Sequence, residues 1–271
     1  MKWTILIILA VAGLALLVSC IQQESPDMAG EGEPAPVLTE AQKHLAAARE
    51  AHGSERLHQS TLEFDFRDYH YKMIRNGGRY QYERSFTDTS GQQVHDVLTN
   101  NEFIRTIDGE QVTLSEKDKS AYSNSVNSVI YFATLPYSLN DAAVQSSYLG
   151  EVEIHDTTYH KVKVTFREEG GGKDHEDEYI YWIRQGDQVI DYLAYNYQVN
   201  GGGARFRVAY NERTIDGVRF VDYKNLKPVP ATLEVEIFDS LYQAGQLEQV
   251  SVIETANVVL EVVDGELEKG G

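Results

Sequence analysis

Asp68 and His70 are the first pair of residues whose types and spacing could support chemistry. They stand two positions apart in a segment of alternating pattern, so we expect both side chains on one face of a β-strand. A carboxylate beside an imidazole can orient the ring for general base catalysis. No Ser or Cys nucleophile in a recognisable motif accompanies the pair. Together with Asp65 and Arg67, the pair favours a structural ion-pair network, with an acid–base enzyme as the alternative.

Three other segments contain residue types that metal or phosphate sites use. The run of residues 174–178, DHEDE, is the densest set of potential Ca²⁺ or Mn²⁺ ligands, but it lacks calcium-loop spacing and follows three glycines, which favours a solvated turn. His155 and His160 flank two threonines, and single surface histidines are the commoner outcome. Gly172-Lys173 lacks the glycine five residues earlier that a phosphate loop needs, and Asp174 replaces its Ser or Thr. We therefore predict no metal and no cofactor.

Cys20 is the only cysteine in the 271 residues, and it closes an apolar N-terminal segment. Lys2 and the apolar stretch from Ile5 to Val18 have the layout of a secretory signal, and the stretch is shorter than the ~20 residues that a spanning helix needs. The tetrad LVSC at residues 17–20 resembles the lipobox of bacterial lipoproteins, whose cysteine sulfur receives diacylglycerol. We predict a lipoprotein signal peptide at residues 1–19 and a lipid with acyl chains such as palmitate on Cys20. The alternative is an ordinary signal peptide with an incidental cysteine.

The composition limits the partners. The formal net charge is −18, and phosphate contacts need clustered Lys and Arg, so we expect no nucleic-acid partner. Contact with the membrane is then made through the Cys20 lipid. Residues 20–37 are rich in Glu, Pro, Gly and Ala and are predicted to be a disordered tether. Ile21, rather than an aspartate, follows the cysteine, which favours the outer membrane and leaves the periplasmic or surface face open.

Apolar spacing predicts the helices. We expect a first helix over residues 40–52, which begins with a capping box from Thr39 to Gln42 and ends before Gly53. A second helix, over residues 116–134, is stopped by Pro136. Its one-sided apolar stripe consists of Tyr122, Val126, Val129, Ile130 and Ala133. A short third helix is expected over residues 141–149.

Most of the remaining chain has the two-residue period of β-strands. Turn signals such as Asn76-Gly77-Gly78 favour antiparallel meanders, and a change of phase at Arg67 predicts a β-bulge. The predicted fold class is mainly β (α+β), with a large curved antiparallel sheet, a half-barrel, that wraps one or two helices. We expect a single β-rich domain at residues 38–263 and a tail at 264–271. Residues 231–263, with a strand at 233–238, extend the sheet, pair with its edge or form a C-terminal extension.

Aromatic residues are the most suggestive set for binding, since the chain has 17 tyrosines and 2 tryptophans. Rings with a polar tip suit an amphipathic cavity, and they suit ordinary cross-strand pairing as well. The predicted ligand-binding residues recur on successive strands: Tyr69, Tyr71, Tyr82, Tyr181, Trp182, Tyr195, Tyr197 and Tyr210.

Four long segments resemble a family of uncharacterised bacterial lipoproteins that is common among the Bacteroidetes. They are residues 64–84 (FDFRDYHYKMIRNGGRYQYER), 114–141, 166–183 and 191–228. The resemblance implies a fold similar to lipoprotein carriers of the LolA and LolB kind, in which a half-barrel sheet wraps helices around an apolar cavity. The family brings no catalytic motif.

The combined expectation is a lipid-anchored envelope protein, not an enzyme, that binds an apolar or amphiphilic ligand such as a lipid in a half-barrel cavity. One alternative is an envelope enzyme that acts on a polymer or glycan, centred on Asp68 and His70. The other is a structural interaction scaffold with a filled core.

Overall fold

A computed structural model describes residues 37–169, 176–198 and 201–262. The signal segment, Cys20, residues 21–36, Asp174, His175 and the expected tail lie outside the described residues. The chain from Leu38 onward forms one compact unit. Within the described ranges, no helix combines the length and the apolar character needed to cross a membrane.

The first sheet, sheet A, has seven antiparallel strands in the order β14-β1-β2-β3-β4-β5-β6. The strands are β1 (Gln59–Phe66), β2 (Tyr69–Asn76), β3 (Arg79–Thr87), β4 (Gln93–Thr99), β5 (Phe103–Ile107), β6 (Glu110–Gln111) and β14 (Ala256–Val262). Phe66 pairs with Tyr69, so Arg67, at φ 57°, and Asp68 form a two-residue hairpin turn. The expected β-bulge at Arg67 is therefore wrong. The turn brings the apolar residues of β1 and β2 to the same face, which explains the change of phase.

The second sheet, sheet B, also has seven antiparallel strands, in the order β13-β12-β11-β10-β9-β8-β7. The strands are β7 (Val144–Ile154), β8 (Thr157–Phe166), β9 (Tyr179–Arg184), β10 (Ile190–Tyr197), β11 (Gly203–Ile215), β12 (Val218–Pro228) and β13 (Leu247–Ile253). The helix expected over residues 141–149 is wrong, because β7 pairs with β8 from Val144 to Ile154. Tertiary pairing here overrides local helix propensity.

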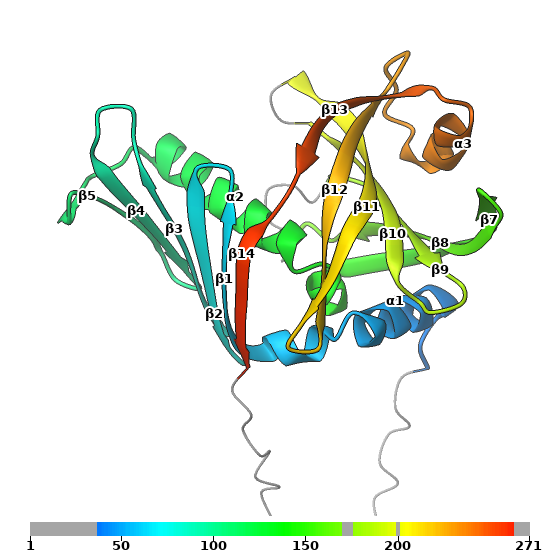
Figure 1. Cartoon of the computed structure of the whole chain (residues 1–271), viewed down its shortest axis with the longest axis horizontal. Helices are drawn as coiled ribbons and strands as arrows, with labels where there is room; N and C mark the ends of the chain where they lie inside the picture. Colours follow the sequence, from blue (N-terminus) through cyan, green and yellow to red (C-terminus); the bar gives the residue numbers. More distant parts are fainter. Residues whose placement is uncertain (1–36, 170–175, 199–200, 263–271) are drawn as a thin grey trace, which may run out of the picture. The chain divides into compact units, whose positions relative to one another are not determined.

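The C-terminal strands join the two sheets. β13 pairs with β12 at the edge of sheet B, and β14 follows directly and pairs with β1 of sheet A. Figure 1 shows this passage, in orange and red, between the two sheets. The strand expected at residues 233–238 is instead a 3₁₀ turn, Val235–Ile237, that leads into helix α3 (Phe238–Gln243).

The two long helices form where the sequence predicts them. Helix α1 (Glu40–Ala51) begins with the Thr39–Gln42 capping box, and helix α2 (Glu116–Ala133) is capped by Ser115. α1 packs on β7 and β8 of sheet B, while α2 lies across β3, β4 and β5 of sheet A (Figure 1). The predicted fold class is confirmed: the described residues are mainly β and form an open half-barrel-like fold with three α-helices. The large antiparallel sheet is divided into two.

Candidate functional site

A cavity of about 240 Å³ lies where α2 meets both sheets. Sheet A contributes residues of β1, sheet B contributes residues of β10 to β13, and α2 contributes its C-terminal half. The lining residues are Phe64, Phe66, Ser128, Val129, Phe132, Ala133, Tyr195, Arg207, Val221, Tyr223, Ile253 and Thr255.

The last turns of α2 explain how both sheets can share one cavity. Ile130 is fully buried with the core residues of sheet A. Phe132 points toward sheet B, where its ring centre lies 5.2 Å from that of Tyr195. Val129 and Ala133 are four residues apart and therefore lie on the same side of the helix, where both line the cavity between the two sheets. The helix therefore packs on sheet A, and its end forms a wall toward sheet B.

Arg207 places a guanidinium group in the otherwise mainly apolar wall. The residue is only 7% exposed. Its Nη2 donates a hydrogen bond to the hydroxyl of Tyr195 at 3.0 Å, and its Cζ lies 3.7 Å from the ring centre of Phe132. Its Nε and Nη1 are buried without a hydrogen-bond partner among the described residues. No Asp or Glu of the described chain forms an ion pair with it.

The other buried arginines are all paired with a carboxylate. Arg84 and Arg105 share Asp96, at 2.6 Å each, and Arg219 contacts Glu212 at 2.9 Å. Burying a charge without a partner is costly, because the protein interior solvates a charge much less well than water does. Arg207 is therefore the exception that needs an explanation.

The alternating pattern of β11 did not identify Arg207 as a site residue. The sequence places Arg205 and Arg207 on a polar face opposite Phe206, which is typical of a half-exposed strand. In the structure Phe206 and Arg207 are both buried, because α3 covers one face of sheet B and α2 approaches the other. Arg207 is distinguished only by the absence of a carboxylate partner among the described residues, and the three-dimensional structure is needed to see this.

The eight predicted aromatic residues are distributed over several environments. Tyr195 lines the cavity. Tyr71 and Tyr82 are buried in the core of sheet A, with Tyr69 packed beside them. Tyr181 belongs to the core under α1, and Trp182 lies on the opposite face of sheet B, where its Nε1 donates to Asp239 at 3.3 Å. Tyr197 packs against Arg205, and the Tyr210 hydroxyl donates to Glu254 at 2.7 Å.

The imidazole of His70 pairs with Asp65 rather than with Asp68. Its Nδ1 lies 2.8 Å from Asp65, and its Nε2 lies 3.7 Å from Glu63. No hydroxyl group of the described residues lies within hydrogen-bond distance of the ring. The exposed arrangement is that of an ion-pair network, and the hypothesis of a base oriented by Asp68 is wrong.

The remaining ligand candidates do not come together. His160 stacks on His44 at 3.8 Å between ring centres, whereas His155 contacts Tyr242. Glu178 pairs with Lys163 at 2.8 Å. The described residues contain no group of three or more His, Cys, Asp or Glu that could hold a metal ion.

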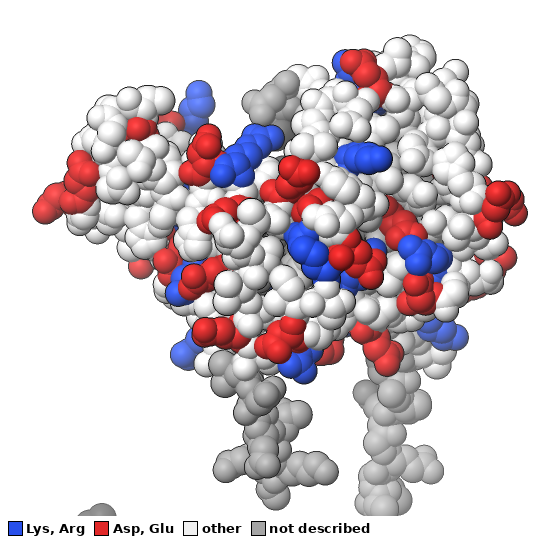
Figure 2. Space-filling view, in the orientation of Figure 1, with Lys and Arg blue, Asp and Glu red and all other residues white. Residues whose placement is uncertain are grey.

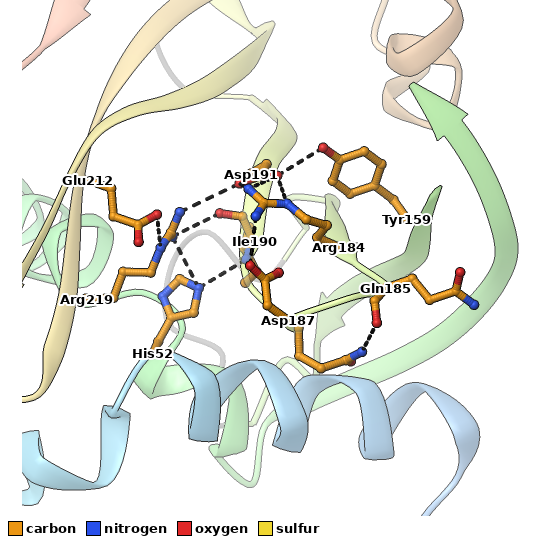
Figure 3. Close-up of polar contacts among 10 residues, drawn as sticks. His52, Tyr159, Arg184, Gln185, Asp187, Ile190, Asp191, Glu212 and Arg219 are labelled. Carbon is orange, nitrogen blue, oxygen red and sulfur yellow. Dashed lines mark hydrogen bonds and ion pairs between the residues drawn. The ribbon is translucent and has the colours of Figure 1, made fainter. Parts of the chain in front are cut away.

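A second buried polar cluster surrounds His52, which ends α1 (Figure 3). The His52 Nε2 accepts a hydrogen bond from the backbone N–H of Ile190 at 3.0 Å and lies 3.4 Å from Arg219. Burial, and then the charge of Arg219, lower the pKa of His52 to about 3. Arg219 also donates to the Ile190 carbonyl, at 3.2 Å, and lies 3.6 Å from Asp191. A neutral ring held in this way ties α1 to sheet B and is no proton carrier at neutral pH.

Charged side chains on the face shown in Figure 2 are interspersed, with acidic and basic groups side by side. No broad basic patch appears on that face, in keeping with the net charge of −18. The one buried cation without a carboxylate in the described chain is the guanidinium in the cavity wall.

Solved structures that resemble the chain are distant. A LolA superfamily protein from Nitrosomonas europaea has a TM-score of 0.44 and 9% identity, covering 81% of this chain and 94% of that one. A DUF1329 family protein from Desulfovibrio piger has a TM-score of 0.40 and 10% identity, covering 84% and 95%. The lipoprotein LppX of Mycobacterium tuberculosis has a TM-score of 0.27 and 12% identity, covering 59% and 90%.

The sequence comparisons give a family and no characterised relative. No curated protein sequence matches the chain. The profile of DUF6503, described as a family of unknown function, matches residues 47–255. Because this match spans well over half of the 271 residues, the chain belongs to the DUF6503 family.

Proposed function

We propose that this chain is a non-enzymatic binding protein that holds the apolar part of an amphiphile in the cavity between α2 and the two sheets. The observation that carries the proposal is the cavity itself, whose walls combine Phe64 and Phe66 of β1, Val129 of α2 and Val221 of β12. A scaffold with a filled core would close this space with side chains, because protein interiors are close-packed.

The volume of the cavity limits the size of the ligand that it can hold. Pockets for drug-sized ligands occupy roughly 300–1,000 Å³, and this cavity has about 240 Å³. A single flexible chain suits such a space better than a rigid polycyclic ligand or several acyl chains together. Aromatic and branched aliphatic walls favour its methylene groups through the hydrophobic effect.

The chain's place in the cell is part of the same proposal. The lipobox-like tetrad at residues 17–20 supports a lipid anchor on Cys20 in the cell envelope. The outer membrane remains our expectation from Ile21. An amphiphile-binding domain held at a membrane would have its ligand source close by.

The test uses the full chain with Cys20→Ser, so that no acyl chain of its own competes for the cavity. Titration with N-phenyl-1-naphthylamine, a neutral apolar fluorophore, is expected to give saturable fluorescence. Val221→Phe fills the cavity and is expected to remove the signal. Val252→Phe is the matched control, because Val252 is 43% exposed on the neighbouring strand β13.

Saturable binding that is equal in all three proteins would place the fluorophore elsewhere and contradict the proposal. Absence of binding in the Cys20→Ser chain itself would also contradict it and would favour the scaffold. Turnover of envelope glycans or polymers that disappears in Asp65→Asn and His70→Gln would favour the enzyme.

A further inference from the structure

We infer that the ligand is an anionic single-chain amphiphile whose carboxylate is held by Arg207 and Tyr195. The inference rests on the proposed function and deepens it by naming the chemical class of the ligand. It also gives a purpose to the one buried arginine that lacks a carboxylate in the described residues.

Arg207 has unsatisfied hydrogen-bonding capacity within the described chain. Nε and Nη1 both lack a partner there, and their N–H groups point to different edges of the planar guanidinium. A buried cation without a counter-charge is costly, and an anion offsets that cost more than a neutral hydroxyl can. The missing partner is therefore an anion such as a carboxylate, and the ligand must supply it.

The hydroxyl group of Tyr195 is a second donor beside the guanidinium. It accepts a hydrogen bond from Arg207 Nη2 at 3.0 Å, so its own hydrogen is free to point to another acceptor. None of the described residues accepts it. Since Tyr195 and Arg207 both line the cavity, a carboxylate there would receive bonds from both residues.

The ring of Phe132 covers the guanidinium at 3.7 Å from Cζ. Both unpartnered nitrogens are shielded from water in this arrangement. A change in the rotamer of this one side chain at the end of α2 would give a carboxylate access to them from the cavity. The carboxylate then accepts hydrogen bonds in the guanidinium plane, where the ring supplies no acceptor.

The net charge of −18 repels small anions from the surface. A carboxylate without an apolar chain should therefore gain little at this site. The methylene chain, which lies against Phe64, Phe66 and Val221, supplies the favourable hydrophobic contribution. Headgroup and chain are both needed.

The experiment compares dodecanoate, dodecanol and acetate by isothermal titration calorimetry at pH 8, below the micellar concentration. The protein is the full chain with Cys20→Ser. Dodecanoate is expected to bind at least about tenfold more tightly than dodecanol, because a hydrogen bond between two charged groups is stronger than one to a neutral hydroxyl. Acetate is expected not to bind measurably.

The variants separate Arg207 from general charge. Arg207→Met should weaken dodecanoate binding by about tenfold or more and leave dodecanol binding within about threefold. Arg207→Lys should fall between, since it keeps the charge and loses the planar set of N–H donors. Tyr195→Phe should lose severalfold for dodecanoate alone. Arg205→Met, on the same strand outside the cavity lining, is the matched control and should behave as the parent chain.

The neutral fluorophore distinguishes the two proposals. Its binding by Arg207→Met shows that the cavity has formed in the variant. Equal affinities for dodecanoate and dodecanol in the parent chain, or parent-like dodecanoate binding in Arg207→Met, would overturn the inference while the proposed function stands. Loss of fluorophore binding in the parent chain would overturn both.

Discussion

The guanidinium carbon of Arg207 lies 3.7 Å from the centre of the Phe132 ring, where β11 of sheet B meets the end of α2. A cation over an aromatic face is favourable, but the face supplies no acceptors for the N–H groups in the guanidinium plane. The protein thus keeps a buried charge incompletely satisfied at the wall of its cavity. Such an arrangement lowers stability unless a ligand completes it.

The first prediction compares two arginines of β11. Arg207→Met should leave the free energy of unfolding of the ligand-free chain within about 1 kcal/mol of the parent or raise it, because an apolar side chain replaces an unpaired buried charge. Arg213→Met should cost about 3–5 kcal/mol, since it leaves Asp222, 2% exposed and 3.0 Å away, without its cation. Urea denaturation measures both.

A similar large loss in both variants would mean that Arg207 serves the packing of α2 on sheet B. In that case the guanidinium would be a structural residue, and its unpartnered nitrogens would carry no information about a ligand.

The second prediction concerns the docking of α2. Ile130 is fully buried, so Ile130→Ala should lower the free energy of unfolding by about 2–5 kcal/mol through lost burial and a new cavity. Ser123, whose hydroxyl donates to the Ser120 carbonyl within the helix, should change it by less than about 1 kcal/mol when replaced by Ala. Equal, small shifts in thermal unfolding would contradict the packing of α2 on sheet A.

Local signals predicted the elements that local physics determines. The Thr39 capping box, the glycine turn after Asn76 and the apolar spacing of Val126 and Ile130 all act within a few residues, and the structure contains each of them. β7 was missed because its pairing with β8, not its own composition, makes it a strand.

The site was harder to predict because it depends on long-range packing. Phe132 lies outside the apolar stripe of the predicted helix. Arg207 lies on the strand face that the alternating sequence pattern predicts to be polar, yet both residues line the cavity. Neither residue has a local signal that it lines a cavity. Tyr195 is the predicted aromatic residue that lines the cavity, and what distinguishes it is its contact with Arg207.

The third prediction concerns pH. The pKa of His52 is about 3 in the folded chain and near 6.5 when unfolded, so between these values the unfolded chain binds a proton that the folded chain does not. This contribution to the free energy of unfolding is fully present above pH 6.5 and is lost as the pH falls toward 3. Between pH 7.5 and pH 5 the loss is about 2 kcal/mol.

His52→Gln should remove that part of the pH dependence, because the amide oxygen accepts a hydrogen bond and does not titrate in this range. The control is His155→Asn, at an exposed turn with φ 46° that asparagine tolerates. Urea denaturation at pH 7.5 and pH 5 gives the difference for each protein. A parent-like pH dependence in His52→Gln would show that other groups account for it.

The fourth prediction concerns the anchor. Cys20→Ser removes the sulfur that would carry diacylglycerol, so the variant should be soluble or unprocessed while the parent chain is in the membrane fraction. Fractionation of the envelope and metabolic labelling with palmitate measure this. Membrane recovery of the serine variant at the parent level would favour an ordinary signal peptide with an incidental cysteine.

The most direct test of the binding account is native mass spectrometry of the full Cys20→Ser chain purified without detergent from the cells that naturally make it. The account predicts an added mass that corresponds to one single-chain amphiphile, which is retained in Val252→Phe and absent in Val221→Phe. A chain that carries no added mass, even after incubation with lipids extracted from its own envelope, would contradict the account.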